Sequence, residues 1–276
     1  MTVTIAAAQR EQFRAEGWFV VEHALDADLL DIARTACDRA RAALEREMRE
    51  RGENRHDNIS ILGSRYFLRK SRERYPELRR VLFNDTTAAF CKATIGVTAY
   101  LQNEQFVVKL REPTSTFPWH QDSGYNVYRG GAQHHPPYVT LWLALDDVSH
   151  ANGTISLLPW SVAGGGELLE HRWDEATESW VGYDGDERGI EIEVPAGSIV
   201  CFSSLSLHRS APNTTERPRR SYVIQYTPTL FRRANDFSGV RGGTQVDLRD
   251  AGNIFSDGDP FLLDGRRVDG APSAAV

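Results

Sequence analysis

The sequence predicts a mainly β fold with some α structure: a jelly-roll or barrel core with an N-terminal helical cover. Two observations predict it. The first hundred residues carry apolar side chains at helical spacing, and after Gly96 the chain changes to many short β-prone runs separated by turns. The sequence contains no internal repeat and no linker. We therefore expect a single domain over 1–276, with the helical cover at 1–98, the jelly-roll core at 99–230, an insertion at 162–189 and a C-terminal tail at 231–276.

The helical cover is expected to contain several helices and one strand. A short amphipathic helix over 8–17 should end at Gly17, and the apolar run 18–21 predicts a strand. A long helix over 26–51 follows, with Asp26 as a plausible N-cap. The segment 51–74 is polar and is expected to be irregular. Two further helical patterns occupy 76–83 and 85–95.

The core is expected to be built from strands. The run 138–148, YVTLWLALDDV, is nearly all apolar and predicts a central buried strand. The other expected strands are 100–110, 155–158, 191–194, 199–203 and 221–227. The insertion is long enough to be a functional flap. The tail is rich in Gly and Asp and has little core-forming pattern.

Composition narrows the class of protein. The chain is 41% hydrophobic and 25% charged, and its net charge of −6 argues against a nucleic-acid partner. No apolar run approaches the roughly 20 residues that span a bilayer, and the N-terminal residues do not resemble a secretion signal. The three cysteines are far apart and odd in number, which fits a reducing compartment. We expect a cytoplasmic protein without a membrane or nucleic-acid partner, and its oligomeric state stays open.

The stretch WHQDSGY, 119–125, contains the first chemical signal. On a strand, His120 and Asp122 would project from the same face, as a metal site or a buried His–Asp hydrogen bond would need. His208, at the end of the run IVCFSSLSLH, is the best candidate for a third ligand. Two histidines and one carboxylate on a β scaffold form the facial triad of non-haem Fe(II) oxygenases. Two rival hypotheses are a non-catalytic ligand-binding jelly-roll and a zinc hydrolase, although no nearby Glu is an obvious general base.

The residues after His208 support the iron hypothesis. An oxygenase of this kind needs a co-substrate, commonly a keto acid whose far carboxylate must be anchored. In HRSAPNTTERPR, Arg219 offers a permanently charged, bidentate partner and Ser210 a hydroxyl. Arg220 should face the other way on the same strand. The alternative interpretation of Arg219-Arg220 is a solvated basic turn.

Three blocks of sequence, in order, resemble the phytanoyl-CoA dioxygenase (PhyH) family of Fe(II)/2-oxoglutarate-dependent oxygenases. They are HQDSGY, YVTLWLALDDVSHANGTISLLPWS and GSIVCFSSLSLHRSAPNTTERPRR, preceded by EQFRAEGWFVVEHAL, and the resemblance covers roughly 10–230. It implies a double-stranded β-helix (a cupin-like jelly-roll) with iron held by His120, Asp122 and His208. It also implies that Arg219 and Ser210 bind the distal carboxylate of 2-oxoglutarate, with O2 as the other co-substrate.

The resemblance extends to further pocket residues. Trp142, Thr140 and Gln105 match or adjoin co-substrate pocket positions, and Lys109 shares the face of Gln105. Core packing for Trp142 and solvation for Gln105 and Lys109 are the alternatives. The expected substrate lining consists of aromatic and polar residues: Tyr125, Asn126, Tyr128, Tyr66, Phe67 and Trp160. At 159–162 the chain reads Pro-Trp-Ser-Val where the family usually has Pro-Gly-Ser-His, so Trp160 could select substrate or cap the core.

The function implied is hydroxylation of an unactivated C–H bond of a small organic molecule, with release of succinate and CO2. Desaturation or ring formation by the same class of enzyme is the alternative. Halogenating relatives lack the carboxylate ligand, so Asp122 favours oxygen chemistry. The cluster Arg65, Arg69, Lys70, Arg72 and Arg74 either binds an anionic substrate or is a solvated helix face.

Overall fold

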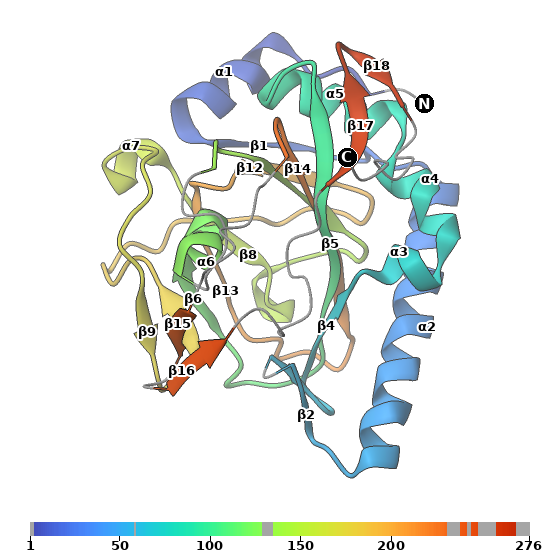
Figure 1. The fold of residues 1–276 in the computed structure, drawn as a ribbon, viewed down its shortest axis with the longest axis vertical. Coiled ribbons are helices and arrows are strands. Elements are labelled where there is room, and N and C mark those ends of the chain that lie inside the picture. Colours follow the sequence, from blue (N-terminus) through green and yellow to red (C-terminus); the bar gives the residue numbers. More distant parts are fainter. Residues whose placement is uncertain are drawn as a thin grey trace.

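Two antiparallel β-sheets face each other at the centre of the molecule, and most of the helices lie on the outer side of the larger one (Figure 1). The structure is a computed structural model that describes residues 3–57, 59–128, 135–230, 238–241, 244–247 and 258–268. The sheets pack through apolar side chains such as Trp142 and Val223 from the larger sheet and Ile155 and Leu157 from the smaller.

The larger sheet has ten strands within the described residues, in the order β1-β12-β7-β14-β5-β4-β3-β2, with β17 beside β5 and β18 beside β17. Their bounds are β1 Trp18–Val21, β2 Arg55–His56, β3 Ser60–Ile61, β4 Arg65–Arg69, β5 Ala99–Lys109, β7 Val139–Ala144, β12 Ile199–Ser203, β14 Arg219–Thr227, β17 Asp259–Leu263 and β18 Arg266–Arg267. Every residue of β7 is buried, as its apolar sequence predicts.

The smaller sheet has the order β11-β8-β13-β6, with β6 Phe117–His120, β8 Ile155–Leu158, β11 Ile190–Glu191 and β13 Leu207–Ser210. From β5 to β8 successive strands alternate between the two sheets, and β12, β13 and β14 alternate again. This winding is that of a double-stranded β-helix, so the predicted jelly-roll is confirmed. Two separate hairpins pair β9 Arg172–Asp174 with β10 Ser179–Val181, and β15 Ser238–Arg241 with β16 Thr244–Asp247.

The N-terminal cover consists of helices that bury the outer face of the larger sheet (Figure 1). These are α1 Ala7–Glu16, α2 Ala27–Arg51, α3 Ser71–Arg74, η1 Pro76–Leu78, α4 Arg79–Leu82 and α5 Asp85–Thr94. Asp26 caps α2 as predicted, because its side chain accepts a hydrogen bond from the Leu29 N–H at 2.9 Å. Elsewhere lie α6 Asp122–Tyr128, η2 His150–Asn152 and α7 Trp160–Ala163.

The two faces of the larger sheet have different tasks, which follow from the two-residue period of a strand. On β14, Tyr222, Ile224 and Tyr226 pack outward into the core beneath the helices. Arg219, Val223 and Gln225 alternate with them and face the smaller sheet, where they line cavities. Arg220 faces away, as predicted, and pairs with Asp146 and Asp38.

Two predictions about the fold are wrong. The segment 51–74 was expected to be irregular, but it forms β2, β3 and β4, and β4 pairs with β5 along its whole length. The tail was expected to add little to the core, yet Phe261 and Leu262 of β17 are fully buried. A short strand that completes an existing sheet needs little periodic pattern of its own, because its neighbour supplies the hydrogen bonds. The remainder of 231–276 lies largely outside the described residues.

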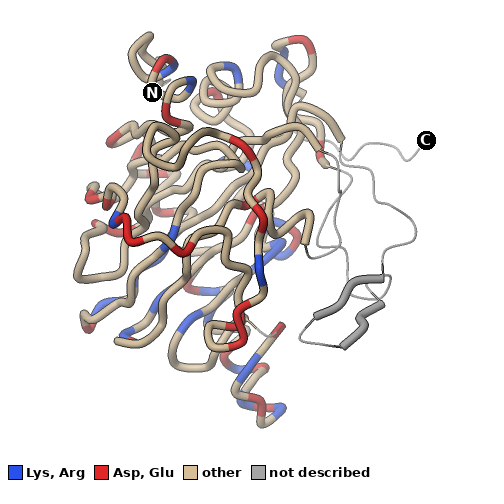
Figure 2. Tube along the Cα trace, turned by 90° about the vertical axis from the view of Figure 1, so that its left-hand side faces the viewer, with Lys and Arg blue, Asp and Glu red and all other residues tan. Residues whose placement is uncertain are grey.

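Acidic and basic residues are interspersed along the face of the molecule that Figure 2 shows. Among the described residues, no helix is both long enough and apolar enough to cross a membrane. Cys37, Cys91 and Cys201 are buried free thiols.

Candidate functional site

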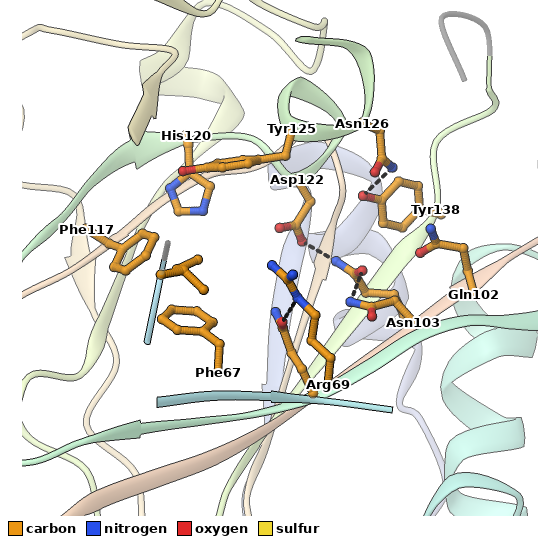
Figure 3. A pocket seen from close by; sticks show the side chains of 13 residues that line it. Phe67, Arg69, Gln102, Asn103, Phe117, His120, Asp122, Tyr125, Asn126 and Tyr138 are labelled. Carbon is orange, nitrogen blue, oxygen red and sulfur yellow. Dashed lines mark hydrogen bonds between the residues drawn. The ribbon is translucent and has the colours of Figure 1, made fainter. Parts of the chain in front are cut away.

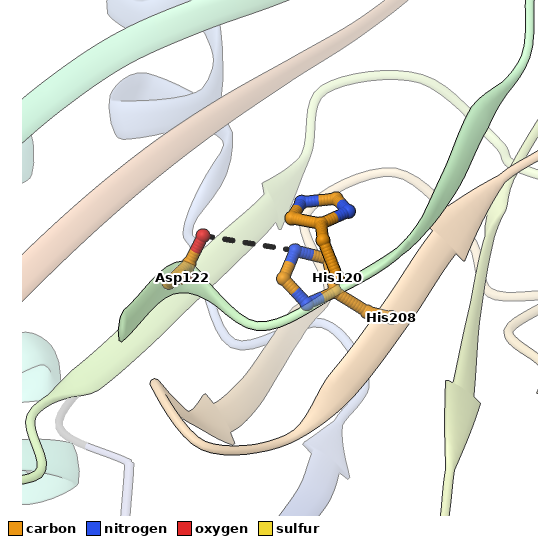
Figure 4. A group of neighbouring side chains, drawn as sticks. All are labelled: His120, Asp122 and His208. Carbon is orange, nitrogen blue, oxygen red and sulfur yellow. Dashed lines mark ion pairs between the residues drawn. The ribbon is translucent and has the colours of Figure 1, made fainter. Parts of the chain in front are cut away.

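The structure brings His120, Asp122 and His208 together between the two sheets (Figure 4). His208 lies opposite His120 in the antiparallel pairing of β13 with β6, and their ring centroids are 4.1 Å apart. The Asp122 Oδ1 atom is 3.7 Å from His208 Nε2, and one ligand atom from each residue lies within 4.8 Å of the others. This spacing fits three ligands around one metal ion.

In both histidines Nδ1 is hydrogen-bonded and Nε2 is the nitrogen available to a metal ion. The His120 Nδ1 atom lies 2.8 Å from the Pro118 carbonyl, and the His208 Nδ1 atom lies 3.1 Å from the Ser206 carbonyl. A carbonyl accepts only from an N–H, so each ring carries its proton on Nδ1 and leaves Nε2 available. Burial, and next the neighbouring His208, hold the pKa of His120 well below its ordinary value. The ring is therefore in the neutral form that a metal ligand requires.

Asp122 does not stand on a strand, so the i, i+2 argument for pairing it with His120 is wrong. The chain leaves β6 at His120 and turns at Gln121, and Asp122 is the first residue of α6. The insertion 162–189 holds this turn. The side-chain amide oxygen of Gln121 accepts a hydrogen bond from the Leu169 N–H, and the side-chain amide nitrogen donates to the Glu167 and Leu205 carbonyls. The backbone N–H of Gln121 donates to Nε2 of the buried His171.

A hydrogen-bond relay orients the Asp122 carboxylate. Its Oδ2 atom accepts from the Thr140 hydroxyl at 2.6 Å and from the Gln225 amide at 2.9 Å. Asn103 in turn donates to the Gln225 amide oxygen at 2.9 Å. With Oδ2 engaged, Oδ1 is the atom left facing His208. Thr140 lines the inner cavity, as the sequence predicts for a pocket residue, and it also fixes this carboxylate.

Two cavities meet at His120 and Asp122, and the inner one also reaches His208. The inner cavity lies between the sheets and brings together every predicted co-substrate residue with several apolar neighbours. Its lining consists of Phe67, Gln105, Val107, Phe117, His120, Asp122, Thr140, Trp142, Ile155, Phe202, His208, Arg209, Ser210, Arg219 and Val223. The outer cavity shares Phe67, Gln105, Phe117, His120 and Asp122 with it. One molecule in each cavity could thus contact the same metal ion.

Arg219 is a buried cation at the inner end of this site. Only 1% of its surface is exposed, and its guanidinium donates to Ser221 Oγ at 3.0 Å and to the Gly153 carbonyl at 2.9 Å. Its Nε atom has no hydrogen-bond partner among the residues that the structure describes. The guanidinium lies 5.6 Å from the centre of the Trp142 ring. Burial lowers the pKa of Arg219 to about 10.

Lys109 is a second buried cation beside it. Lys109 lies directly opposite Arg219 in the pairing of β5 with β14, and 2% of its surface is exposed. Its ammonium donates to Ser210 Oγ at 2.8 Å and to the Ala211 carbonyl at 2.6 Å. Burial, and then Arg219, place the pKa of Lys109 well below 10.5. It is therefore not the solvated residue that the alternative interpretation describes.

The pair of cations identifies what the inner cavity can hold. Within the described residues, neither Arg219 nor Lys109 has a carboxylate in ion-pair contact; both donate to neutral oxygens. Two adjacent buried cations without a counter-charge are costly, and a bound anion removes that cost. A carboxylate at Arg219 and Ser210 would do so, and a small keto acid reaching from there to the three ligands fits the donor set.

The outer cavity adjoins His120 and Asp122 (Figure 3). Tyr125 and Asn126 line it, as the sequence predicts, and the Tyr125 ring centroid is 5.2 Å from that of His120. Sequence reasoning missed Gln102, Asn103, Tyr138 and Gln225 of its polar lining, and it named Arg69 only within the basic cluster that binds an anionic substrate or forms a solvated helix face. A signal existed for Gln225, a polar residue within the apolar strand SYVIQYT, in step with Arg219 at a period of two.

Three predicted substrate residues lie elsewhere. Tyr128 packs against His171 and Trp180, with ring centroids 5.6 Å and 5.5 Å apart, and lines neither cavity. Tyr66 is fully buried in the core under the helices, and its hydroxyl accepts from the Gly63 N–H. Its neighbour Phe67 faces the cavities instead, because successive residues of β4 point to opposite faces. Trp160 packs on Gly17, where a Cβ would lie 2.5 Å from the indole, and it lines neither cavity. Trp160 therefore caps the core at the end of α1.

Comparison with known proteins identifies the family of this chain. The model of the family described as "Phytanoyl-CoA dioxygenase (PhyH)" matches residues 13–221. A probable phytanoyl-CoA dioxygenase of Caenorhabditis elegans is 29% identical over 49% of this chain and 43% of its own length. An L-proline trans-4-hydroxylase of Streptomyces griseoviridis is 26% identical over 48% of this chain and 56% of its own. The chain thus spans about half the length of these curated relatives.

A solved structure shares the fold. EvdO2 from Micromonospora carbonacea var. aurantiaca, complexed with 2-oxoglutarate, superposes with a TM-score of 0.64 at 19% identity, over 86% of this chain and 96% of that one. At this level of identity the likeness concerns the fold. The family model, however, matches well over half of the chain in sequence. The chain therefore belongs to the phytanoyl-CoA dioxygenase family, whose members are Fe(II)- and 2-oxoglutarate-dependent oxygenases.

Proposed function

We propose that this chain is an Fe(II)- and 2-oxoglutarate-dependent dioxygenase that hydroxylates an unactivated C–H bond of a small organic molecule, releasing succinate and CO2. The observation that carries the proposal is the juxtaposition of the three candidate ligands with two buried cations that have no acidic partner among the described residues. Family membership and the 2-oxoglutarate bound to a structure of the same fold support it.

In this proposal His120, Asp122 and His208 are the residues that would hold iron(II). Iron and 2-oxoglutarate together supply an oxidant made from O2 that is strong enough to attack a C–H bond. The protein's own residues do the positioning. Thr140 and Gln225 keep Asp122 in one orientation, and the two backbone carbonyls fix the histidine tautomers.

Arg219 and Ser210 bind the far carboxylate of 2-oxoglutarate. Lys109, which lies opposite Arg219 and donates to Ser210, adds a second positive charge beside them. The Lys109 ammonium donates to Ser210 Oγ, so the hydroxyl hydrogen is directed away from Lys109 and is available to the carboxylate. Trp142 and Val223 form apolar walls of the same cavity and exclude water from it. The keto-acid end would then point toward the three ligands, since the cavity extends from Arg219 to His208 and Asp122.

Two rival functions fit less well. A zinc hydrolase needs a general base, and Asp122 is the only carboxylate among the described residues that line either cavity. A non-catalytic binding protein has no use for a cation pair next to three convergent metal ligands. Hydroxylation is preferred to halogenation because Asp122 supplies the carboxylate ligand, and desaturation or ring formation would use the same site.

Succinate formation tests the proposal. Purified protein with Fe(II), 2-oxoglutarate and O2 should form succinate slowly even without its substrate. His208→Ala should abolish this turnover, whereas His150→Ala, an exposed histidine away from the site, should retain it. Succinate formation that is equal in the His208→Ala variant, or absent from iron-loaded wild type, would refute the proposed function.

A further inference from the structure

We infer that the substrate is a small polar molecule carrying an oxyanion group, a carboxylate or a phosphate, and that Arg69 binds this group in the outer cavity. The inference rests on the proposed function, because it concerns the substrate of the same site. It follows from the charge, the arrangement and the size of the outer cavity.

The charge of the lining is the first argument. Apart from the candidate ligands His120 and Asp122, Arg69 is the only ionisable Lys, Arg, His, Asp or Glu side chain among the described residues that line this cavity. The other polar groups are neutral amides and phenols: Gln102, Asn103, Gln105, Asn126, Gln225, Tyr125 and Tyr138. The Asp122 carboxylate is already engaged by Thr140, Gln225 and the metal position. Arg69 is thus the one cationic side chain that the described lining adds to the candidate ligands.

The position of Arg69 is the second argument. Arg69 lies opposite Gln105 in the pairing of β4 with β5, and its Nε donates to the Gln105 amide oxygen at 3.4 Å. Figure 3 shows the side chain extending from β4 into the cavity toward Asp122. A guanidinium has five donors in a planar fork, and this arrangement suits the paired oxygens of a carboxylate or phosphate.

The cavity also has two unlike sides. Phe67 and Phe117 lie beside His120 on one side in Figure 3, while Gln102, Asn126 and Tyr138 lie on the other. A substrate whose oxyanion is bound by Arg69 would place hydrocarbon against the two phenylalanines, next to the metal position, and further polar groups against the amides. The C–H bond to be oxidised would belong to that hydrocarbon part.

Size limits the substrate further. The volume of the cavity is about 110 Å³. For comparison, an apolar cavity of roughly 150 Å³ holds one benzene molecule. The enclosed part of the substrate therefore has only a few heavy atoms, as in an amino acid, a hydroxy acid or a small phosphate monoester. Arg69 does not line the inner cavity, so this anion site is distinct from that of 2-oxoglutarate.

Matched pairs of compounds test the inference. The visible absorption of the anaerobic Fe(II)·2-oxoglutarate protein is titrated with free amino acids and with their primary amides, and separately with small phosphate monoesters and the parent alcohols, at constant ionic strength. Acids or phosphate esters should perturb the absorption and stimulate succinate formation at roughly 10- to 100-fold lower concentration than their neutral partners. Which of the two series responds identifies the oxyanion.

Variants of Arg69 separate recognition from folding. Arg69→Gln should remove the preference for the charged partner while leaving the response to the neutral one, and Arg69→Lys should retain part of it. Arg74→Gln, an exposed arginine outside the cavity, is the matched control. The inference is overturned if neutral compounds act as well as anions, if no anion of either series acts, or if Arg69→Gln keeps the preference. Failure of the wild type to form the absorption at all would instead refute the proposed function.

Discussion

Lys109 provides the sharpest test of how the co-substrate is anchored. Lys109→Met keeps the length of the side chain and removes its charge. The lost ammonium donates to Ser210 Oγ at 2.8 Å and lies opposite Arg219. A unit charge about 6 Å from a carboxylate contributes roughly 3 kcal/mol at an effective dielectric constant of ~20, before desolvation is subtracted. A net contribution of roughly 1–3 kcal/mol corresponds to about a 5- to 150-fold loss of 2-oxoglutarate affinity.

Anaerobic titration of the Fe(II)-loaded protein with 2-oxoglutarate measures this loss, and Lys92→Met, an exposed lysine on α5, is the control. The pH dependence adds a second criterion. The pKa of Lys109 lies well below 10.5 in the empty protein because of burial, and a bound carboxylate raises it again. Wild-type affinity should therefore fall as the pH rises through this window, whereas that of Lys109→Met should not. Unchanged affinity in the variant, with iron still bound, would refute the reasoning.

Three other changes have definite expected outcomes. Gln225→Leu removes one hydrogen-bond donor to Asp122 Oδ2. The affinity for iron should therefore fall roughly 10- to 100-fold with little change in Tm. An unaltered affinity would show that the relay does not orient the ligand. Glu104 is buried, and burial raises its pKa from 4.5 to about 7, so the folded state resists its ionisation and stability should decline as the pH rises through this window. Glu104→Gln should escape this decline and gain roughly 3 kcal/mol relative to wild type between the two ends of the window, measured by denaturant unfolding; parallel pH profiles would contradict the assignment. Gly124→Ala would place a Cβ 2.2 Å from Nε2 of His171. Helix α6 and its first residue, Asp122, should therefore shift, and the affinity for iron should drop. A variant with wild-type affinity would show that the insertion does not hold this turn.

The sequence was sufficient for the parts of the site that follow from motif spacing. His120, Asp122 and His208 meet, and Arg219 and Ser210 line the cavity beside them, as the HxD motif and the HRSAPNTTERPR block predict. The local geometry of Asp122 could not be predicted, since the turn at Gln121 depends on contacts with the distant insertion.

The outer cavity was harder to predict for a different reason. Arg69 belongs to a five-residue strand, RYFLR, whose sequence has no clean alternation and which is ordered by pairing with β5. Tyr66 and Phe67 are adjacent aromatic residues, and sequence alone does not decide which of them faces the metal. The single-domain organisation over 1–276 and the cytoplasmic location remain predictions.

The central claim is that 2-oxoglutarate and iron(II) meet at His120, Asp122 and His208. Anaerobic absorption spectroscopy tests it most directly. Addition of 2-oxoglutarate to the Fe(II)-loaded wild type should produce a visible metal-to-ligand charge-transfer band, which succinate does not produce and which is lost in His208→Ala. Iron that binds tightly to the wild type but gives no such band with 2-oxoglutarate would contradict the account.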